Sequence, residues 1–140
     1  MEPTGGSVGA FIAEVTPAKR QRDAGTLVAM MAEITGREAE LWGTIIGFGS
    51  CHYRYPTGNE GDMPILAFSP RKTSSTIYLD SVAAHTDGLE RLGPHTSSVG
   101  CLYIKDLELI DLDVLRGILQ QTYAWTIAGG DERARITVTD

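Results

Sequence analysis

The chain has 140 residues, of which 42% are hydrophobic and 21% are charged, and its formal net charge is −6. This length and composition are typical of one globular domain with a sizeable core, and they exclude widespread disorder. The acidic balance argues against non-specific nucleic-acid binding, which needs a basic surface, and against docking on an anionic membrane.

The sequence favours a cytoplasmic protein. It contains no apolar run of about 18 residues, so no transmembrane helix is expected. Residues 1–6 lack the basic and apolar regions of a signal peptide and are expected to be flexible. Cys51 and Cys101 form no C-x-x-C motif, and we expect reduced thiols rather than a disulfide.

Helices are expected at the start of the chain. Ser7 can cap a short helix over 8–15, and Thr16-Pro17 is typical of a second helix start, with Thr16 as the N-cap. Apolar residues then recur with a helical period until Gly36, the expected stop. These residues are Ala24, Leu27, Val28, Met31 and Ile34.

After an expected helical turn over 38–41, the pattern changes to short segments rich in β-branched and aromatic residues. Gly, Pro, Asn and Ser separate these segments, which is typical of an antiparallel meander. The expected strands cover 45–48, 51–55, 64–69 and 76–80, with a hairpin loop over 56–62.

The last third predicts a short helix over 87–92, a strand over 100–105, and a final helix that Asp111 caps. Residues 129–140 are expected to form a tail or an additional edge strand. Strands grouped between helices predict an α+β fold. We therefore expect one domain over 7–128, with an antiparallel sheet of about five strands flanked by N-terminal and C-terminal helices.

The strand over 51–55 carries the first candidate site. Side chains alternate along a strand, so His52 and Arg54 share one face, while Cys51, Tyr53 and Tyr55 share the other. Two interpretations remain open. The strand is half-buried with a solvated His and Arg, or its polar face presents both side chains to an anionic or polar ligand.

A second candidate is Ser69-Pro70-Arg71-Lys72. If the strands over 51–55 and 64–69 pair, Arg71 and Lys72 fall close to His52, and together with Lys105 they form a cationic cluster for an anion. The alternative is that these charges are only solvated. The cluster predicts weaker phosphate or carboxylate binding in an Arg54→Ala variant.

The main helix begins with Lys19, Arg20 and Arg22, which oppose the helix macrodipole. Free N–H groups and three cations at this end can hold an anion. The alternative is that Asp23 and nearby acids neutralise the charge.

Metal ligation and nucleophilic catalysis have weaker support. No His or Cys sits at a recognised ligand spacing; the donors considered are Cys51, His52, Glu60, Asp62, His85, His95 and Cys101. The acidic run from Asp106 to Asp113 either attracts a hard cation or supplies a helix cap and surface charges. Cys51 and His52 point to opposite faces of a strand, so enzymatic activity is not favoured.

Several motifs together resemble the YdhG-like family of bacterial domains of unknown function, in order over about residues 7–125. They are Trp42-Gly43-x-x-Ile46-Gly47-Phe48-Gly49-Ser50-x-His52-Tyr53-Arg54-Tyr55, Gly58-x-Glu60-Gly61-Asp62, Phe68-Ser69-Pro70-Arg71-Lys72, Leu92-Gly93-x-His95, Cys101-Leu102-Tyr103-Ile104-Lys105 and Asp111-Leu112-Asp113-x-Leu115. The resemblance implies a compact α+β fold. Through a distant frataxin-like branch it also implies iron delivery for iron–sulfur cluster or haem assembly.

These observations predict a small binding or carrier module that requires no cofactor and has iron or another small ligand as its cargo. The alternative is a protein-interaction domain without a small ligand. The candidate ligand-binding residues are His52, Arg54, Tyr55, Asp62, Arg71, Lys72 and Lys105.

Overall fold

The computed structural model describes all residues from 1 to 140 and contains helices and antiparallel strands. The helices are α1 (Val8–Ala13), α2 (Ala18–Thr35), α3 (Thr86–Leu92) and α4 (Leu112–Ile127), with 3₁₀ turns η1 (Val82–His85) and η2 (Leu107–Leu109). The strands are β1 (Ala39–Trp42), β2 (Ile45–Phe48), β3 (Cys51–Arg54), β4 (Glu60–Met63), β5 (Leu66–Pro70), β6 (Ser75–Tyr78), β7 (Thr96–Ser97), β8 (Cys101–Ile104), β9 (Gly130–Asp131) and β10 (Ala134–Val138).

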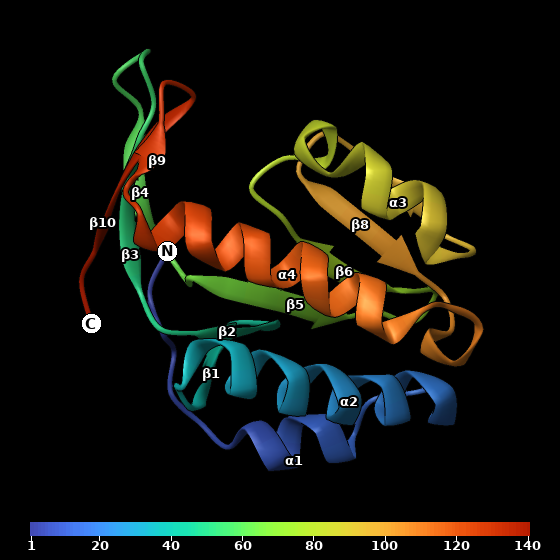
Figure 1. The fold of residues 1–140 in the computed structure, drawn as a ribbon. Coiled ribbons are helices and arrows are strands. Elements are labelled where there is room, and N and C mark those ends of the chain that lie inside the picture. Colours follow the sequence, from blue (N-terminus) through green and yellow to red (C-terminus); the bar gives the residue numbers. More distant parts are fainter.

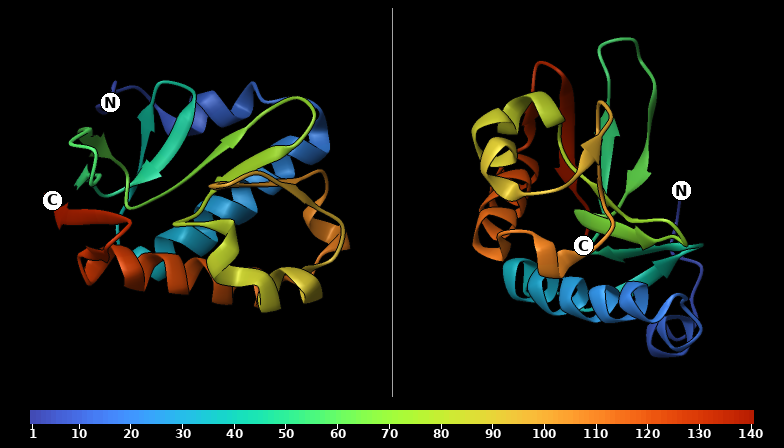
Figure 2. Two further views of the ribbon diagram at one scale, coloured as in Figure 1. Left: turned by 90° about the horizontal axis from the view of Figure 1, so that it is seen from above. Right: turned by 90° about the vertical axis from the view of Figure 1, so that its right-hand side faces the viewer.

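The strands form two antiparallel sheets. The first has six strands in the order β1-β2-β5-β6-β8-β7, and the second has four in the order β4-β3-β10-β9. Helices α2 and α4 pack on the first sheet, α3 packs on α4, and α1 packs on α2 (Figures 1 and 2). The α+β class with flanking helices is confirmed, with the strands divided between two sheets. No helix is both long enough and apolar enough to cross a membrane.

The strand pairing differs from the expected meander. Strand β2 pairs directly with β5, with Ile46 opposite Phe68, whereas β3 pairs with β4 and β10. The β3–β4 hairpin therefore leaves the first sheet after β2, and the chain returns as β5 (Figure 1). Gly49 marks this corner with a φ of +70°, a conformation that glycine adopts without strain.

Local expectations are met in part. Ser7 caps α1 by accepting the N–H of Ala10, and Asp111 caps α4. The helical turn expected over 38–41 is wrong, because these residues lie in or next to β1, which pairs with β2. Thr16 is not the N-cap of α2; Pro17 occupies that position without a side-chain cap.

Both chain ends are attached to the sheets. Strand β10 lies between β3 and β9, so the C-terminal segment adds both an inner strand, β10, and a short edge strand, β9, to the second sheet. At the other end, the N–H of Thr4 donates to the carbonyl of Leu41 over 2.9 Å, and the hydroxyl of Thr4 accepts the N–H of Gly43 over 3.0 Å. The N-terminal segment therefore extends along β1.

The main core lies between the helices and the first sheet. Its buried residues come from α2, α3, α4 and the sheet, with Phe68 opposite Ile77 and Ile77 opposite Leu102 on the helix-facing side. A smaller core lies under the second sheet and consists of Cys51, Ile65, Ala134 and Ile136. Burial of these apolar surfaces supplies most of the driving force for folding.

A buried arginine connects α2 to the end of the first sheet. Arg20 is only 1% exposed, and its guanidinium donates to the carbonyls of Arg71 over 2.7 Å and Lys105 over 2.9 Å. Asp23, one helical turn later and fully buried, accepts the N–H of Leu107 over 3.0 Å. The two charges lie 3.7 Å apart, so each offsets part of the other's desolvation cost.

Replacing Arg20 is expected to destabilise the fold strongly. An Arg20→Met variant leaves two buried carbonyls without a donor and Asp23 without this partner, which costs about 3 kcal/mol. Urea unfolding measures the change. Lys19→Met, which removes an exposed charge from the same turn, is the control and should change the free energy of unfolding by less than about 0.5 kcal/mol. Equal midpoints for both variants would contradict the role assigned to Arg20.

Candidate functional site

The outer face of the β3–β4 hairpin brings together two of the expected site residues. His52 and Asp62 are cross-strand partners, and Nδ1 of His52 lies 2.9 Å from Oδ1 of Asp62. Nε2 of His52 lies 2.9 Å from Oε1 of Glu60. Hydrogen bonds to Asp62 and Glu60 raise the pKa of His52. Both ring nitrogens are therefore already occupied by carboxylates, which leaves neither free for a ligand.

Arg54 and Tyr55 lie at the far end of the same hairpin. They line an open hollow of about 380 Å³ together with Asp131, Glu132 and Arg135. Tyr55 also contributes to a largely apolar cavity of about 240 Å³ on the inner side of the hairpin, where its ring centroid lies 5.1 Å from that of Tyr53. Tyr55 is thus the one expected residue that joins two hollows.

The expected cluster of His52 with Arg71, Lys72 and Lys105 does not form. That cluster required the strand carrying His52 to pair with β5, but the two strands belong to different sheets. Arg71 and Lys105 instead lie together at one end of the first sheet, where Arg20 binds the backbone carbonyls of both residues. Lys72 lines a separate shallow hollow beside α1.

A cavity of about 500 Å³ opens beside Lys105, and we call it the Lys105 cavity. Its lining comes from the β5–β6 turn, β7, β8, η2 and the segment after α3. The residues are Thr73, Ser74, Pro94, His95, Thr96, Tyr103, Lys105, Asp106 and Leu109. Hydroxyl groups and one ammonium group share this cavity with the apolar surfaces of Pro94 and Leu109, so it offers both polar and apolar contacts.

The charges around the Lys105 cavity leave one cation unpaired. Oδ1 of Asp106 accepts a 2.6 Å hydrogen bond from Arg22. A backbone hydrogen bond from Glu108 and the charge of Arg22 lower the pKa of Asp106. The ammonium of Lys105 forms no ion pair.

Nδ1 of His95 lies 2.7 Å from the carbonyl of Gly93, which can only accept, so Nδ1 carries a proton and Nε2 is free to face a ligand.

The cations at the start of α2 do not form an anion site. Arg22 binds Asp23, Asp106 and Glu108, and Arg20 is buried against backbone carbonyls. Neutralisation by Asp23 and nearby acids, the alternative that the sequence left open, is therefore correct for Arg20 and Arg22.

The cysteines are not paired, and the potential metal ligands form no metal site. Cys51 and Cys101 are both free thiols. Burial, together with the charges of Asp140 and Asp62, raises the pKa of Cys51 to about 12, so its thiol stays protonated at neutral pH. No group of three or more His, Cys, Asp or Glu side chains is arranged to hold a metal ion. Asp111, in the acidic run, caps α4.

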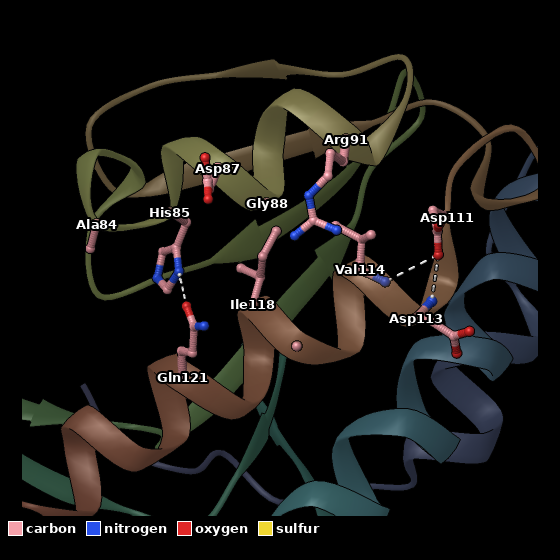
Figure 3. A pocket seen from close by; sticks show the side chains of 11 residues that line it. Ala84, His85, Asp87, Gly88, Arg91, Asp111, Asp113, Val114, Ile118 and Gln121 are labelled. Atoms are coloured by element: carbon pink, nitrogen blue, oxygen red, sulfur yellow. Dashed lines mark hydrogen bonds between the residues drawn. The ribbon is translucent and has the colours of Figure 1, made fainter.

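A further cavity, of about 510 Å³, lies between α3 and α4 (Figure 3), and His85, one of its lining residues, belongs to a buried ion pair. Nε2 of His85 lies 2.6 Å from Oδ1 of Asp80, and Nδ1 of His85 lies 3.0 Å from Oε1 of Gln121. Both of these oxygens can accept hydrogen bonds, which matches a ring with a proton on each nitrogen. The hydrogen bond to Asp80 is the main cause of the raised pKa of His85.

The partner carboxylate, Asp80, is almost fully buried. Burial acts to raise its pKa, but hydrogen bonds from His85, from the backbone of Ser81 and from Thr122 outweigh this effect and lower it. Sequence reasoning considered His85 only as a metal donor and missed Asp80 and Gln121. Asp80 and His85 lie five positions apart in the segment that joins β6 to α3, whereas Gln121 comes from α4, and this spacing matches no recognised motif.

Comparisons of this chain with family models, with curated proteins and with solved structures find no match.

The stability of the protein is expected to depend on pH through His85. Because its folded pKa is raised above the ordinary 6.5, charged His85 contributes its full stabilisation below that value and loses it as pH rises through the folded pKa. Each unit of elevation corresponds to about 1.4 kcal/mol.

Urea unfolding between about pH 5 and pH 9 measures this dependence. The comparison is made in a His52→Gln background, because His52 also has a raised pKa. The difference in free energy of unfolding between the His52→Gln variant and the double variant that also carries His85→Gln should shrink as pH rises. A difference that stays constant with pH would contradict the charged pair.

Proposed function

We propose that this chain is a small-ligand binding module and that the Lys105 cavity is its site for an organic anion. The observation that carries the proposal is the unpaired ammonium of Lys105 in a cavity of about 500 Å³ whose only carboxylate is already bound by Arg22. An anionic group entering this cavity meets one free positive charge and several hydroxyl donors.

The polar donors suit a phosphate or carboxylate group. Hydroxyls of Thr73, Ser74 and Thr96 can donate to anionic oxygens, and a charge-assisted bond from an ammonium is about twice as strong as a neutral one. Arg20 holds the backbone of Lys105 and of the neighbouring turn in place. Ligand binding therefore requires little ordering of the backbone, which reduces its entropic cost.

The apolar part of the lining favours an organic anion over a bare inorganic one. Pro94 and Leu109 contribute to the same cavity, and Leu109 is 64% exposed without a ligand. A ring or short aliphatic body attached to the anionic group would cover this surface. Burying apolar area contributes about 25 cal/mol per Å².

Two other expectations have less specific support. The large exposed apolar side chains are scattered along the chain, and the two on α4 lie at opposite ends of that helix, so no single element carries an apolar stripe for a partner protein; they are Met1, Tyr55, Val99, Leu109, Leu112 and Ile127. Iron delivery, implied by the family resemblance, remains a prediction. An anaerobic thermal melt with excess ferrous iron tests it, since a rise in melting temperature that is absent with magnesium would support it.

Titration with phenyl phosphate tests the proposed site. We expect binding that is tighter than that of inorganic phosphate, because the phenyl ring gains apolar contacts. At about 100 times its dissociation constant, the ligand should add about 2.7 kcal/mol to stability. A Lys105→Met variant should bind at least about tenfold more weakly, because it loses a charge-assisted hydrogen bond.

Two controls make this titration specific. Lys72→Met removes an equal charge outside the cavity, and Arg54→Ala removes a cation from the other sheet; both should bind phenyl phosphate as the wild type does. Equal losses of affinity in Lys105→Met and Lys72→Met would mean that the net charge of the protein, and not contact with Lys105, determines binding. Unchanged binding in Lys105→Met would remove the proposal.

A further inference from the structure

The cavity between α3 and α4 is separate from the Lys105 cavity and shares no lining residue with it. The side chain of Arg91 extends from α3 toward α4, and Asp87 of the same helix also lines the cavity (Figure 3). The two residues are four positions apart on one helix, yet neither forms an ion pair or a side-chain hydrogen bond. One unpaired acid and one unpaired base therefore face the same hollow of about 510 Å³.

Gln121 adds an NH₂ donor to the cavity, and its hydrogen bond to His85 fixes the orientation of this group. Its Oε1 accepts the proton on Nδ1 of His85, so its amide nitrogen is directed away from the ring (Figure 3). His85 in turn is only 4% exposed and is held by Asp80 through a 2.6 Å contact. The buried pair thus orients the NH₂ group of Gln121 on the wall that faces Arg91.

The balance of charge selects the kind of ligand. Asp111 and Asp113, at the start of α4, also line the cavity, so acids outnumber the single guanidinium of Arg91. Oδ1 of Asp111 is occupied by the N–H groups of Asp113 and Val114. A purely anionic ligand would be repelled by these carboxylates, whereas a zwitterion offers a positive group to them and a negative group to Arg91.

We propose that this cavity binds a small zwitterion of the α-amino-acid class, with its carboxylate on Arg91 and Gln121 and its ammonium on Asp87. Val114 and Ile118 form the apolar floor that receives the ligand's side chain. Gly117 leaves the hollow open, because a Cβ atom added there would meet no atom within 4 Å.

The orientation of Gln121 makes binding dependent on pH. When His85 loses the proton on Nδ1, that nitrogen becomes an acceptor, and the Gln121 amide must turn its NH₂ group toward it. The cavity then receives a carbonyl oxygen, which repels the ligand's carboxylate. The charged groups around His85 are Asp80, Arg133 and Asp87.

The test is isothermal titration of the protein at about pH 6 with each of the twenty common L-amino acids, up to about 10 mM. Acetate and methylammonium, which carry one charge each, are the ligand controls. At least one amino acid should bind more tightly than both, and its affinity should fall as pH rises through the folded pKa of His85. The absence of binding by all twenty, or equally tight binding of acetate, would overturn the proposal.

Variants then locate the binding. Arg91→Gln and Asp87→Asn should each weaken binding by about tenfold or more, whereas Glu90→Gln on the exposed side of the same helix should not.

Gly117→Leu should fill the hollow and abolish binding without lowering the melting temperature, with Gly25→Ala in α2 as the glycine control. His85→Gln should remove the pH dependence. Wild-type binding in Arg91→Gln and Gly117→Leu would refute this site, and the outcome is independent of Lys105→Met.

Discussion

The hydrogen bonds from buried Arg20 to the carbonyls of Arg71 and Lys105 fix the part of the molecule on which the proposed site depends. They join α2 to the β5–β6 turn and to the end of β8, three segments that are distant in the sequence. Asp23 adds a contact to the backbone of Leu107 in η2. The β5–β6 turn, the end of β8 and η2, which form part of the wall of the Lys105 cavity, are thus attached to the start of α2.

Burying the ion pair of Arg20 and Asp23 costs desolvation energy, which the hydrogen bonds of both side chains to the backbone must offset. An apolar residue in place of Arg20 would avoid the desolvation of a charge, but it would leave the two carbonyls unpaired. Arg20 and Arg22 stand at the start of α2 although they oppose the helix dipole, because other groups bind them. Arg20 binds the carbonyls of Arg71 and Lys105, and Arg22 binds Asp23, Asp106 and Glu108. Arg22 neutralises Asp106, and this leaves Lys105 as the unpaired charge.

Local signals predicted the helices well and the sheets poorly. Ser7, Gly36 and Asp111 mark helix ends through caps that depend on neighbouring residues only. Which strands pair depends on contacts between distant segments, and the β3–β4 hairpin fits either a meander or a second sheet. The expected site was therefore divided, with His52 and Asp62 on one sheet and Arg71 and Lys105 at the end of the other. The pair of Asp80 and His85 was not predicted, because their spacing of five positions belongs to no recognised motif.

The most direct measurement is a two-dimensional NMR titration of the labelled protein with phenyl phosphate, because it locates the ligand without a substitution. The largest shift changes should fall on the amides of Thr73, Ser74, Thr96 and Lys105, with none of comparable size on the β3–β4 hairpin. Changes centred on His52 and Arg54, or an absence of changes at saturating ligand, would contradict the assignment of the anion site to the Lys105 cavity.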